Sequence, residues 1–171
     1  MLNLPTKIEP LPLADLFRSA MREFVGTVSV ITVGEGAQRS GLVATSVVSL
    51  SLDPPMVLAC INRSGSSWPL FGRFRHFGIN TLRPDHQALA DRFAGRGGVK
   101  GCARYDVGEW TTAVTGAPLL ADGVVALDCE LDEAIEKASH GIIIGRVRAV
   151  RTQPLESPLV YWRGTYRTIS G

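Results

Sequence analysis

Short, hydroxyl-bearing side chains recur along the segment GLVATSVVSLSLDPP, residues 41–55. The small or hydroxyl-bearing residues of this segment are Gly41, Ala44, Thr45, Ser46, Ser49 and Ser51. Because their side chains are short, a flat aromatic ligand could lie against the main chain and accept hydrogen bonds from its N–H groups. In the alternative interpretation, Val43, Val47 and Leu50 alternate toward a core and the hydroxyl groups face water. The segment alone leaves both interpretations open.

A second polar cluster, NRSGSS, follows an apolar run over residues 56–61. The residues of this cluster with short hydrogen-bonding groups or a permissive backbone are Asn62, Ser64, Gly65, Ser66 and Ser67. A loop of this composition can form a concavity of N–H groups that binds an anion, and Arg63 adds positive charge beside it. An ordinary polar loop is the alternative.

His140 is distant in sequence from both segments and belongs to no metal-ligand pattern. Imidazole has an unperturbed pKa of about 6.5, so His140 can hold or release a proton near neutral pH. A lone histidine can equally well be structural or solvated. His76 and His86 are interpreted as structural or exposed, because one begins an expected strand and the other lies near an expected helix start.

The composition favours a small-molecule partner. The chain has 171 residues, 45% of them hydrophobic, which predicts a single domain over residues 1–171 with its core at about residues 16–169. Its 18 basic and 16 acidic side chains give a net charge of +2 and form no long runs, so we expect neither nucleic acid nor a membrane surface as a partner. Cys60, Cys102 and Cys129 are far apart and form no CxxC pair, so we expect no metal site and reduced thiols.

The N-terminal segment MLNLPTKIEP contains prolines and an acidic residue where a secretory signal needs an apolar run. No later segment has the run of about eighteen apolar residues that a spanning helix requires. We therefore expect a cytoplasmic protein.

Hydrophobic spacing predicts two helices, over residues 11–24 and 84–94. The remaining apolar runs have the β-branched and aromatic content of strands, and they cover residues 27–34, 42–55, 56–61, 77–82, 124–131, 141–151 and 159–169. The first two runs flank the turn-rich segment GEGAQRSG, as in a β-hairpin. Neither an alternating βαβ order nor a GxGxxG segment is present, so a closed or nearly closed antiparallel barrel is favoured over a Rossmann sheet.

Several short segments are informative as an ordered set. They are Gly26–Thr32, GLVATSVVSLSLDPP, Cys60–Ser64, Ile79–Leu82, Leu89–Gly95, Trp110, Thr115–Leu120, Leu127–Cys129, Ser139–His140, Ile144–Val147, Pro158–Tyr161 and Arg163–Tyr166. In this order the chain resembles the short-chain flavin reductases, the NAD(P)H:flavin oxidoreductase components of two-component flavin-dependent monooxygenases. The resemblance extends from about Leu16 to Ile169. One departure is Val43, where many members carry threonine.

The resemblance implies a mainly β fold with a few helices, of the split β-barrel, Greek-key antiparallel type, that binds FMN or FAD and works as a homodimer whose second chain helps to wall the site. It implies that the main chain near Ala44 and the hydroxyls of Thr45 and Ser46 meet the flavin ring, and that residues 60–67 hold the ribityl and phosphate end. The flavin-binding residues implied in this way are Ala44, Thr45, Ser46, Val47, Ser51, Pro55, Cys60, Ile61, Asn62, Ser64, Ser66, Ser67 and Phe93.

The same resemblance implies that the catalytic residue is His140 and that it lies on the nicotinamide side, together with Arg163 and Tyr166. For the last two, a surface strand with an ordinary packed aromatic residue is the alternative. The implied reaction is hydride transfer from NADH or NADPH to the flavin, with reduced flavin passing to a separate oxygenase. Two other functions remain open: a flavoprotein reductase of a metal complex such as a cobalt corrin or ferric chelate, and a non-catalytic flavin- or haem-binding module.

Overall fold

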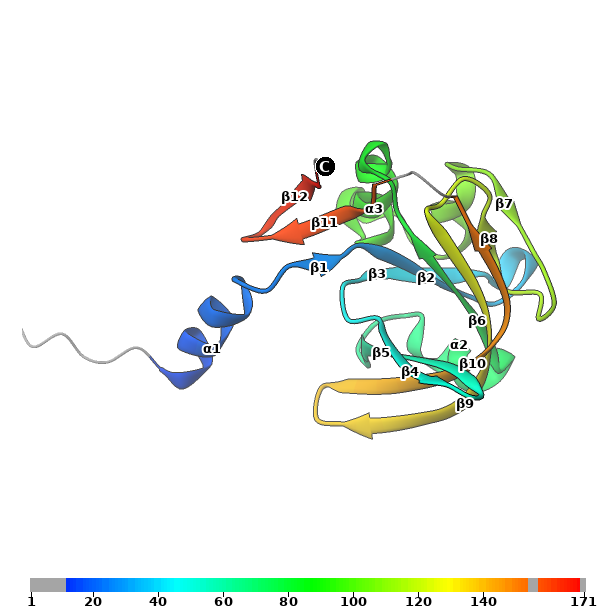
Figure 1. Ribbon diagram of the computed structural model, residues 1–171, viewed down its shortest axis with the longest axis horizontal. Coiled ribbons are helices and arrows are strands. Elements are labelled where there is room, and N and C mark those ends of the chain that lie inside the picture. Colours follow the sequence, from blue (N-terminus) through cyan, green and yellow to red (C-terminus); the bar gives the residue numbers. More distant parts are fainter. Residues whose placement is uncertain (1–11, 154–156, 170–171) are drawn as a thin grey trace, which may run out of the picture.

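The computed structural model describes residues 12–153 and 157–169, which form mainly antiparallel β structure with a few helices (Figure 1). In chain order the strands are β1 (Gly26–Thr27), β2 (Ser29–Val33), β3 (Ser40–Ala44), β4 (Val48–Leu52), β5 (Pro55–Asn62), β6 (His76–Thr81), β7 (Trp110–Thr111), β8 (Leu119–Leu120), β9 (Val125–Lys137), β10 (His140–Thr152), β11 (Leu159–Trp162) and β12 (Thr165–Thr168). The α-helices are α1 (Leu13–Met21), α2 (Trp68–Phe74) and α3 (Gln87–Phe93), and short 3-10 turns are η1 (Gly36–Gln38), η2 (Pro84–His86), η3 (Arg96–Gly98) and η4 (Gly101–Asp106). No helix among the described residues has the length and apolar character needed to cross a lipid bilayer.

The largest sheet has the strand order β3-β2-β6-β9-β10-β5-β4, and every neighbouring pair in it is antiparallel. Its edge strands, β3 and β4, are consecutive in the chain, and only residues 45–47 separate them. The sheet therefore curls until its two edges approach each other (Figure 1). The smaller sheets are β1-β11-β12 and β7-β8.

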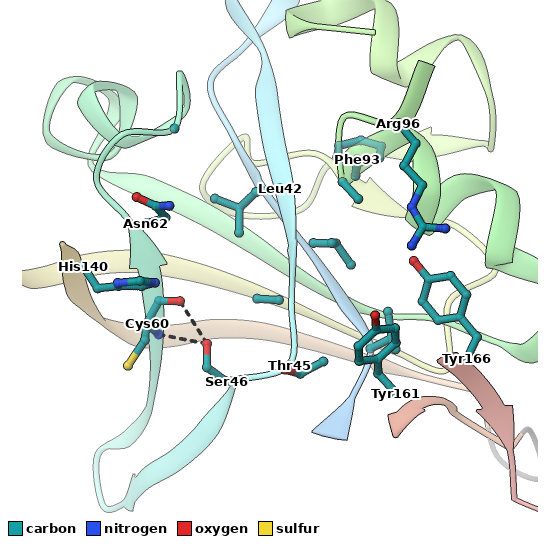
Figure 2. A pocket seen from close by; sticks show the side chains of 15 residues that line it. Leu42, Thr45, Ser46, Cys60, Asn62, Phe93, Arg96, His140, Tyr161 and Tyr166 are labelled. Atoms are coloured by element: carbon teal, nitrogen blue, oxygen red, sulfur yellow. Dashed lines mark hydrogen bonds between the residues drawn. The ribbon is translucent and has the colours of Figure 1, made fainter. Parts of the chain in front are cut away.

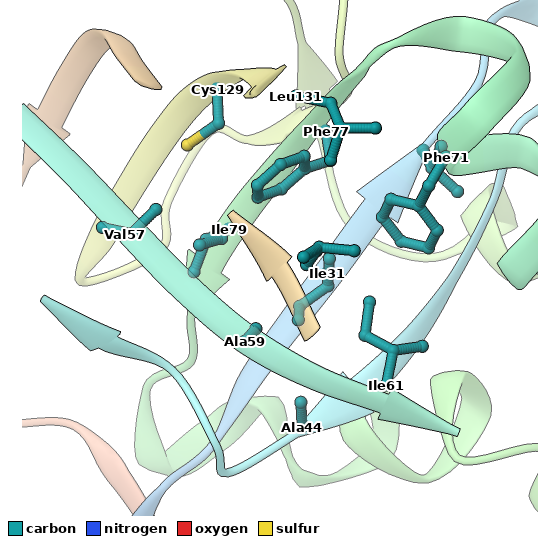
Figure 3. Close-up of a cluster of buried hydrophobic side chains, with 12 residues drawn as sticks. Ile31, Ala44, Val57, Ala59, Ile61, Phe71, Phe77, Ile79, Cys129 and Leu131 are labelled. Carbon is teal, nitrogen blue, oxygen red and sulfur yellow. The ribbon is translucent and has the colours of Figure 1, made fainter. Parts of the chain in front are cut away.

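Two groups of buried apolar side chains fill the protein. The first lies inside the curled sheet, where Ile31 of β2, Ile61 of β5, Phe71 of α2 and Phe77 of β6 point toward one another (Figure 3). The second lies under α3 and includes Val28, Leu89, Phe93, Tyr105 and Leu159. Burial of large side chains at about 25 cal/mol per Å² is the main favourable contribution to folding.

The two predicted helices and the β2–β3 hairpin are confirmed, although the structure differs from the predictions in several places. The predicted run over 42–55 is divided, because residues 45–47 lie between β3 and β4. The predicted helix over 84–94 is present as η2 followed by α3. Helix α2 was not predicted, because its 7 residues are too few to show helical periodicity. The predicted strand over 159–169 is two strands, because Arg163 and Gly164 adopt φ values of 50° and 84° and turn the chain back.

Strands β9 and β10 extend beyond the predicted runs. Residues 132–140 are all exposed, so no alternation of buried and exposed residues marks this part of the hairpin in the sequence. Cross-strand pairing continues to His140 and Lys137 next to the turn. The outer part of β9 therefore extends beyond its neighbour β6, while β10 stays paired with β5 as far as His140.

Gly145 in β10 provides a test of the packing in the first apolar group. A Cβ atom at this position would lie 2.4 Å from the ring of Phe77 and 3.1 Å from the Cβ atom of Cys129. Since backbone and ring cannot both move freely in a packed core, we expect Gly145→Ala to lower the free energy of unfolding by about 1–3 kcal/mol in urea denaturation.

Gly72 is the matched control for this experiment. It lies within α2, and a Cβ atom there would have no neighbour within 4 Å. Gly72→Ala should leave the free energy of unfolding unchanged or raise it by up to about 1 kcal/mol, because alanine is the better helix former. Equal midpoints for the two variants would contradict the packing described at Gly145.

Candidate functional site

A cavity of about 590 Å³ lies beside the joint between the two edges of the largest sheet (Figure 2). Pockets of this volume are typical of small-molecule sites. The lining residues are Val28, Leu42, Val43, Ala44, Thr45, Ser46, Cys60, Asn62, Gly65, Phe93, Ala94, Arg96, His140, Tyr161 and Tyr166. These residues come from β3, β5, β10, β11, β12, the end of α3, η3 and the segments between strands, so the cavity is built by much of the chain.

Ser46, between edge strands β3 and β4, is bonded to β5. Its hydroxyl donates to the carbonyl oxygen of Cys60 at 2.9 Å and accepts from the N–H of the same residue at 3.1 Å (Figure 2). One side chain thus supplies both hydrogen bonds that a neighbouring strand would make, because residues 45–47 lie outside the ladder. No loop or turn hydrogen bond of the described residues engages the N–H groups of Thr45 or Ser46, so these donors are available to a ligand.

One wall of the cavity is formed by Asn62 and His140, which are direct partners in the β5–β10 register. The Oδ1 atom of Asn62 accepts from the N–H of Ser64 at 3.0 Å and from its hydroxyl at 2.9 Å, which fixes the turn after β5. His140 is exposed, and its Nδ1 lies 2.9 Å from the hydroxyl of Ser139. A histidine in this position can contact both solvent and a bound molecule.

The opposite wall is formed by Tyr161, Tyr166 and Arg96 (Figure 2). The two tyrosine rings are packed edge to face with their centroids 5.4 Å apart. The Tyr166 hydroxyl donates to Asp91 at 3.0 Å. Burial, followed by the hydrogen bond and the negative charge of Asp91, raises the pKa of Tyr166 to about 12, so the phenol stays neutral at physiological pH.

The interior side of the cavity is apolar. Leu42 and Val43 of β3 and the ring of Phe93 lie there, and Phe93 is only 1% exposed. A Cβ atom at Gly41 would lie 2.8 Å from the Phe93 ring. The glycine in β3 therefore makes room for an aromatic ring of the protein itself.

The structure brings together about half of the residues that the sequence analysis assigned to the site. Those that line the cavity are Ala44, Thr45, Ser46, Cys60, Asn62, Phe93, His140 and Tyr166. Those that do not line it are Val47, Ser51, Pro55, Ile61, Ser64, Ser66, Ser67 and Arg163.

The position of Ser67 explains why it lies away from the cavity. It is 2% exposed, and its hydroxyl bonds to that of Ser40 at 2.9 Å and to the carbonyl oxygen of Gly41 at 3.0 Å. These bonds attach the start of α2 to β3. Ile61 likewise points into the first apolar group. Ser67 and Ile61 thus contact other parts of the protein and do not line the cavity.

Arg163 lies at the turn between β11 and β12 and is directed toward α1. Its guanidinium is ion-paired with Glu23 at 2.8 Å and lies over the ring of Trp162, 4.6 Å from its centroid. Its main chain also exchanges hydrogen bonds with Arg22. Arg163 therefore does not line the cavity, whereas Tyr166, which was assigned to the same side of the site, does.

Sequence reasoning assigned no role to several lining residues: Val28, Leu42, Ala94, Arg96 and Tyr161. Arg96 had an available signal, because it is flanked by Gly95, Gly97 and Gly98 directly after α3. A basic side chain in a glycine-rich loop at the end of a helix is a reasonable anion-binding candidate. The apolar lining residues Val28, Leu42 and Ala94 have no such signal, because apolar residues in strands and helices are expected in the protein core.

These residues suit a flat, partly polar ring system such as a flavin. The apolar side offers contact area, the N–H groups of Thr45 and Ser46 offer donors at one edge, and Arg96 offers charge for a phosphate. Among residues 12–153 and 157–169, no three His, Cys, Asp or Glu side chains gather as they would around a metal ion.

Several proteins similar to this chain are named for reactions of flavins with NADH. An FMN reductase (NADH), RutF 2, from Methylorubrum extorquens is 37% identical over 156 residues, which cover 91% of this chain and 90% of the relative. BorF, the flavin reductase component of a bacterial two-component tryptophan halogenase, superposes with a TM-score of 0.84 at 28% identity, covering 92% of this chain and 99% of BorF.

A third similar protein was solved with ligands. It is the NADH:FAD oxidoreductase SgcE6 of Streptomyces globisporus in complex with NAD and FAD fragments, with a TM-score of 0.84 at 26% identity, covering 95% of this chain and 97% of that one. The sequence model of the flavin reductase like domain matches residues 21–170. A match of this extent, on a fold and a cavity that suit the ligand, means that this chain belongs to the flavin reductase like family.

Proposed function

We propose that this protein transfers a hydride from NADH to a flavin held in the 590 Å³ cavity. The observation that carries the proposal is the lining of that cavity. Apolar side chains, unengaged N–H donors at Thr45 and Ser46, and His140 surround one space in a chain of the flavin reductase like family. FMN is the expected flavin and NADH the expected donor, because relatives are named FMN reductase (NADH).

The protein's part in the reaction is positioning. A bound flavin supplies the hydride-accepting chemistry at its N5 atom. Thr45 and Ser46 donate main-chain hydrogen bonds to the polar edge of the ring, and Leu42 and Phe93 exclude water from its other parts. His140 would face the nicotinamide, where its imidazole would either donate a hydrogen bond to the carboxamide or supply a proton to the reduced flavin. No protein nucleophile takes part.

A steady-state matrix tests this function. NADH and NADPH are each combined with FMN, FAD and riboflavin, and nicotinamide oxidation is followed by absorbance. We expect turnover with NADH that rises with added FMN, because the cavity is open enough for flavin to exchange. Retained flavin with no response to added flavin would favour a reductase of a metal complex, and binding without turnover would favour a non-catalytic module.

His140→Ala tests the role of the histidine. We expect kcat/KM for NADH to fall by about ten- to a thousand-fold, because the nicotinamide loses an orienting or proton-donating group. Flavin affinity should change by no more than a few-fold, since the ring is held by β3 and the following loop. Stopped-flow reduction of flavin-saturated enzyme separates the two effects.

Lys137→Ala is the control for this variant. Lys137 is the direct cross-strand partner of His140 on β9, is exposed, and does not line the cavity. Its substitution should leave flavin reduction unchanged. An unaltered reduction rate and NADH affinity in His140→Ala would contradict a role of His140 in the reaction.

We also infer finer features of the architecture and of the reaction's destination. The order of the largest sheet, with its two edges joined by residues 45–47, supports a split β-barrel of Greek-key type that forms one domain. BorF, a reductase component of a two-component halogenase, supports a separate oxygenase as the acceptor of reduced flavin. The open cavity is consistent with flavin that leaves between turnovers.

The exposed apolar face of α1 supports a homodimer. Leu13, Leu16, Phe17 and Met21 are 81%, 49%, 64% and 45% exposed, and no residue of α1 is buried. The helix extends away from the sheets (Figure 1). A helix of 9 residues is marginal in water without packing, so this face requires a partner. A second copy, whose β4 exposes Leu52, offers an apolar surface of similar kind.

Light scattering tests the dimer. Wild type should give twice the 18.4 kDa mass of one chain at micromolar concentration. The double variant Leu16→Asp with Phe17→Asp should give the monomer mass, because two charges would have to be buried in the interface. Ser19→Asp, on the polar side of α1, is the control and should remain a dimer. A wild-type monomer in the presence of flavin would contradict the proposal.

A further inference from the structure

Arg96 is the only arginine or lysine among the described residues that line the cavity. The cavity has no lining carboxylate among these residues either, so the charge of Arg96 is not balanced from within the lining. Both substrates of the proposed reaction carry phosphate groups, and arginine binds phosphate well because its planar fork can donate two hydrogen bonds.

The position of Arg96 is set by glycines. Gly95, Gly97 and Gly98 have φ values of 80°, 73° and 75°, which other residues rarely adopt. This backbone carries Arg96 from the end of α3 to the rim of the cavity, where its side chain is 60% exposed (Figure 2). A Cβ atom at Gly97 or Gly98 would have no neighbour within 4 Å, so glycine is required there by backbone shape rather than by crowding.

Asp91 forms an ion pair with the Arg96 guanidinium from outside the cavity lining. The two side chains form an ion pair at 2.9 Å, and the same Oδ1 atom of Asp91 accepts the hydroxyl proton of Tyr166 at 3.0 Å. Asp91 itself does not line the cavity. An ion pair this exposed contributes little to stability, so a ligand phosphate can displace the carboxylate from Arg96 at small cost.

The loop after β5 offers less than the sequence predicted for a phosphate. Ser64, Ser66 and Ser67 do not line the cavity, and Arg63 is ion-paired with Glu136 and bonded to the carbonyl oxygen of Ala138. The charged group that can approach a ligand is therefore on the other wall, at the end of α3.

We infer that Arg96 binds a phosphate of the substrates in this cavity and that Asp91 is its internal competitor. This inference rests on the proposed function. In the absence of ligand, Asp91 neutralises Arg96; when a phosphate arrives, Arg96 exchanges one anion for another. The exchange lowers the net gain from the phosphate contact, which suits a flavin or nicotinamide that must leave after each turnover.

Paired ligands that differ only by phosphate test the inference. Riboflavin is FMN without its phosphate, and dihydronicotinamide riboside is reduced nicotinamide mononucleotide without its phosphate. In Arg96→Gln, we expect the Kd for FMN or the KM for reduced nicotinamide mononucleotide to rise about tenfold or more, because a charge-assisted hydrogen bond is lost. The values for the matching phosphate-free ligand should stay within twofold. Whichever pair responds identifies the phosphate that Arg96 binds.

Asp91→Asn should act in the opposite direction. Asparagine keeps an oxygen for the Tyr166 hydroxyl but removes the charge that competes for Arg96. Affinity for the phosphate-bearing ligand should rise about two- to fivefold, the size expected for an exposed ion pair, with no change for its phosphate-free partner. Arg167→Gln is the control: Arg167 is exposed on β12 beside Tyr166, does not line the cavity, and reports only a general effect of charge.

The outcomes separate this inference from the proposed function. Turnover by wild type, with equal losses for both members of each ligand pair in Arg96→Gln, would overturn the role of Arg96 and leave the reductase proposal intact. An unchanged or weaker affinity in Asp91→Asn would overturn the competition. A wild type that neither binds flavin nor oxidises NADH would instead overturn the proposed function.

Discussion

The two hydrogen bonds between the Ser46 hydroxyl and the main chain of Cys60 are the interaction on which the site depends. They hold β3 against β5 at the place where the sheet ladder is interrupted, and so they leave the neighbouring main-chain donors unpaired on one side. A regular strand across residues 45–47 would use those donors internally. The contact between residues 45–47 and β5 and the polar edge of the cavity therefore lie at the same place.

The cavity combines two walls of different chemistry. Asn62 and His140 are fixed by strand register, because each is the direct partner of the other between β5 and β10. On the other wall, Tyr166 is the register partner of Tyr161 between β11 and β12, and the glycine-rich loop after α3 carries Arg96. Both side chains also contact Asp91, so this wall adds an exposed ionic cluster to its backbone pairing. Such a cluster suits a group that must bind and release, whereas strand register suits a group that must be aligned with a reacting atom.

Much of the fold could be predicted from the sequence, because α3 buries one face and so has helical periodicity, while the central strands β2 and β6 are buried along nearly their whole length and stand out as short, largely apolar runs. The outer part of the β9–β10 hairpin could not, since residues 132–140 are exposed on both faces. In the site, Ser46 and Asn62 were predicted as ligand contacts, whereas their side chains also bond to the protein itself. Composition does not distinguish a serine that faces a ligand from one such as Ser67 that fastens two elements together, because the difference lies in tertiary contacts.

The cavity walls come from nearly the whole described chain, from Val28 of the β1–β2 junction to Tyr166 of β12. Such a cavity does not exist in a partly folded chain, because β11 and β12 must dock before its last wall is present. A ligand that binds only the complete cavity adds its binding free energy to the native state alone and raises the apparent stability by mass action. Occupancy by flavin is therefore also a measure of the fraction of chains that have completed folding, and contacts between residues so far apart in sequence make that completion slow relative to local structure.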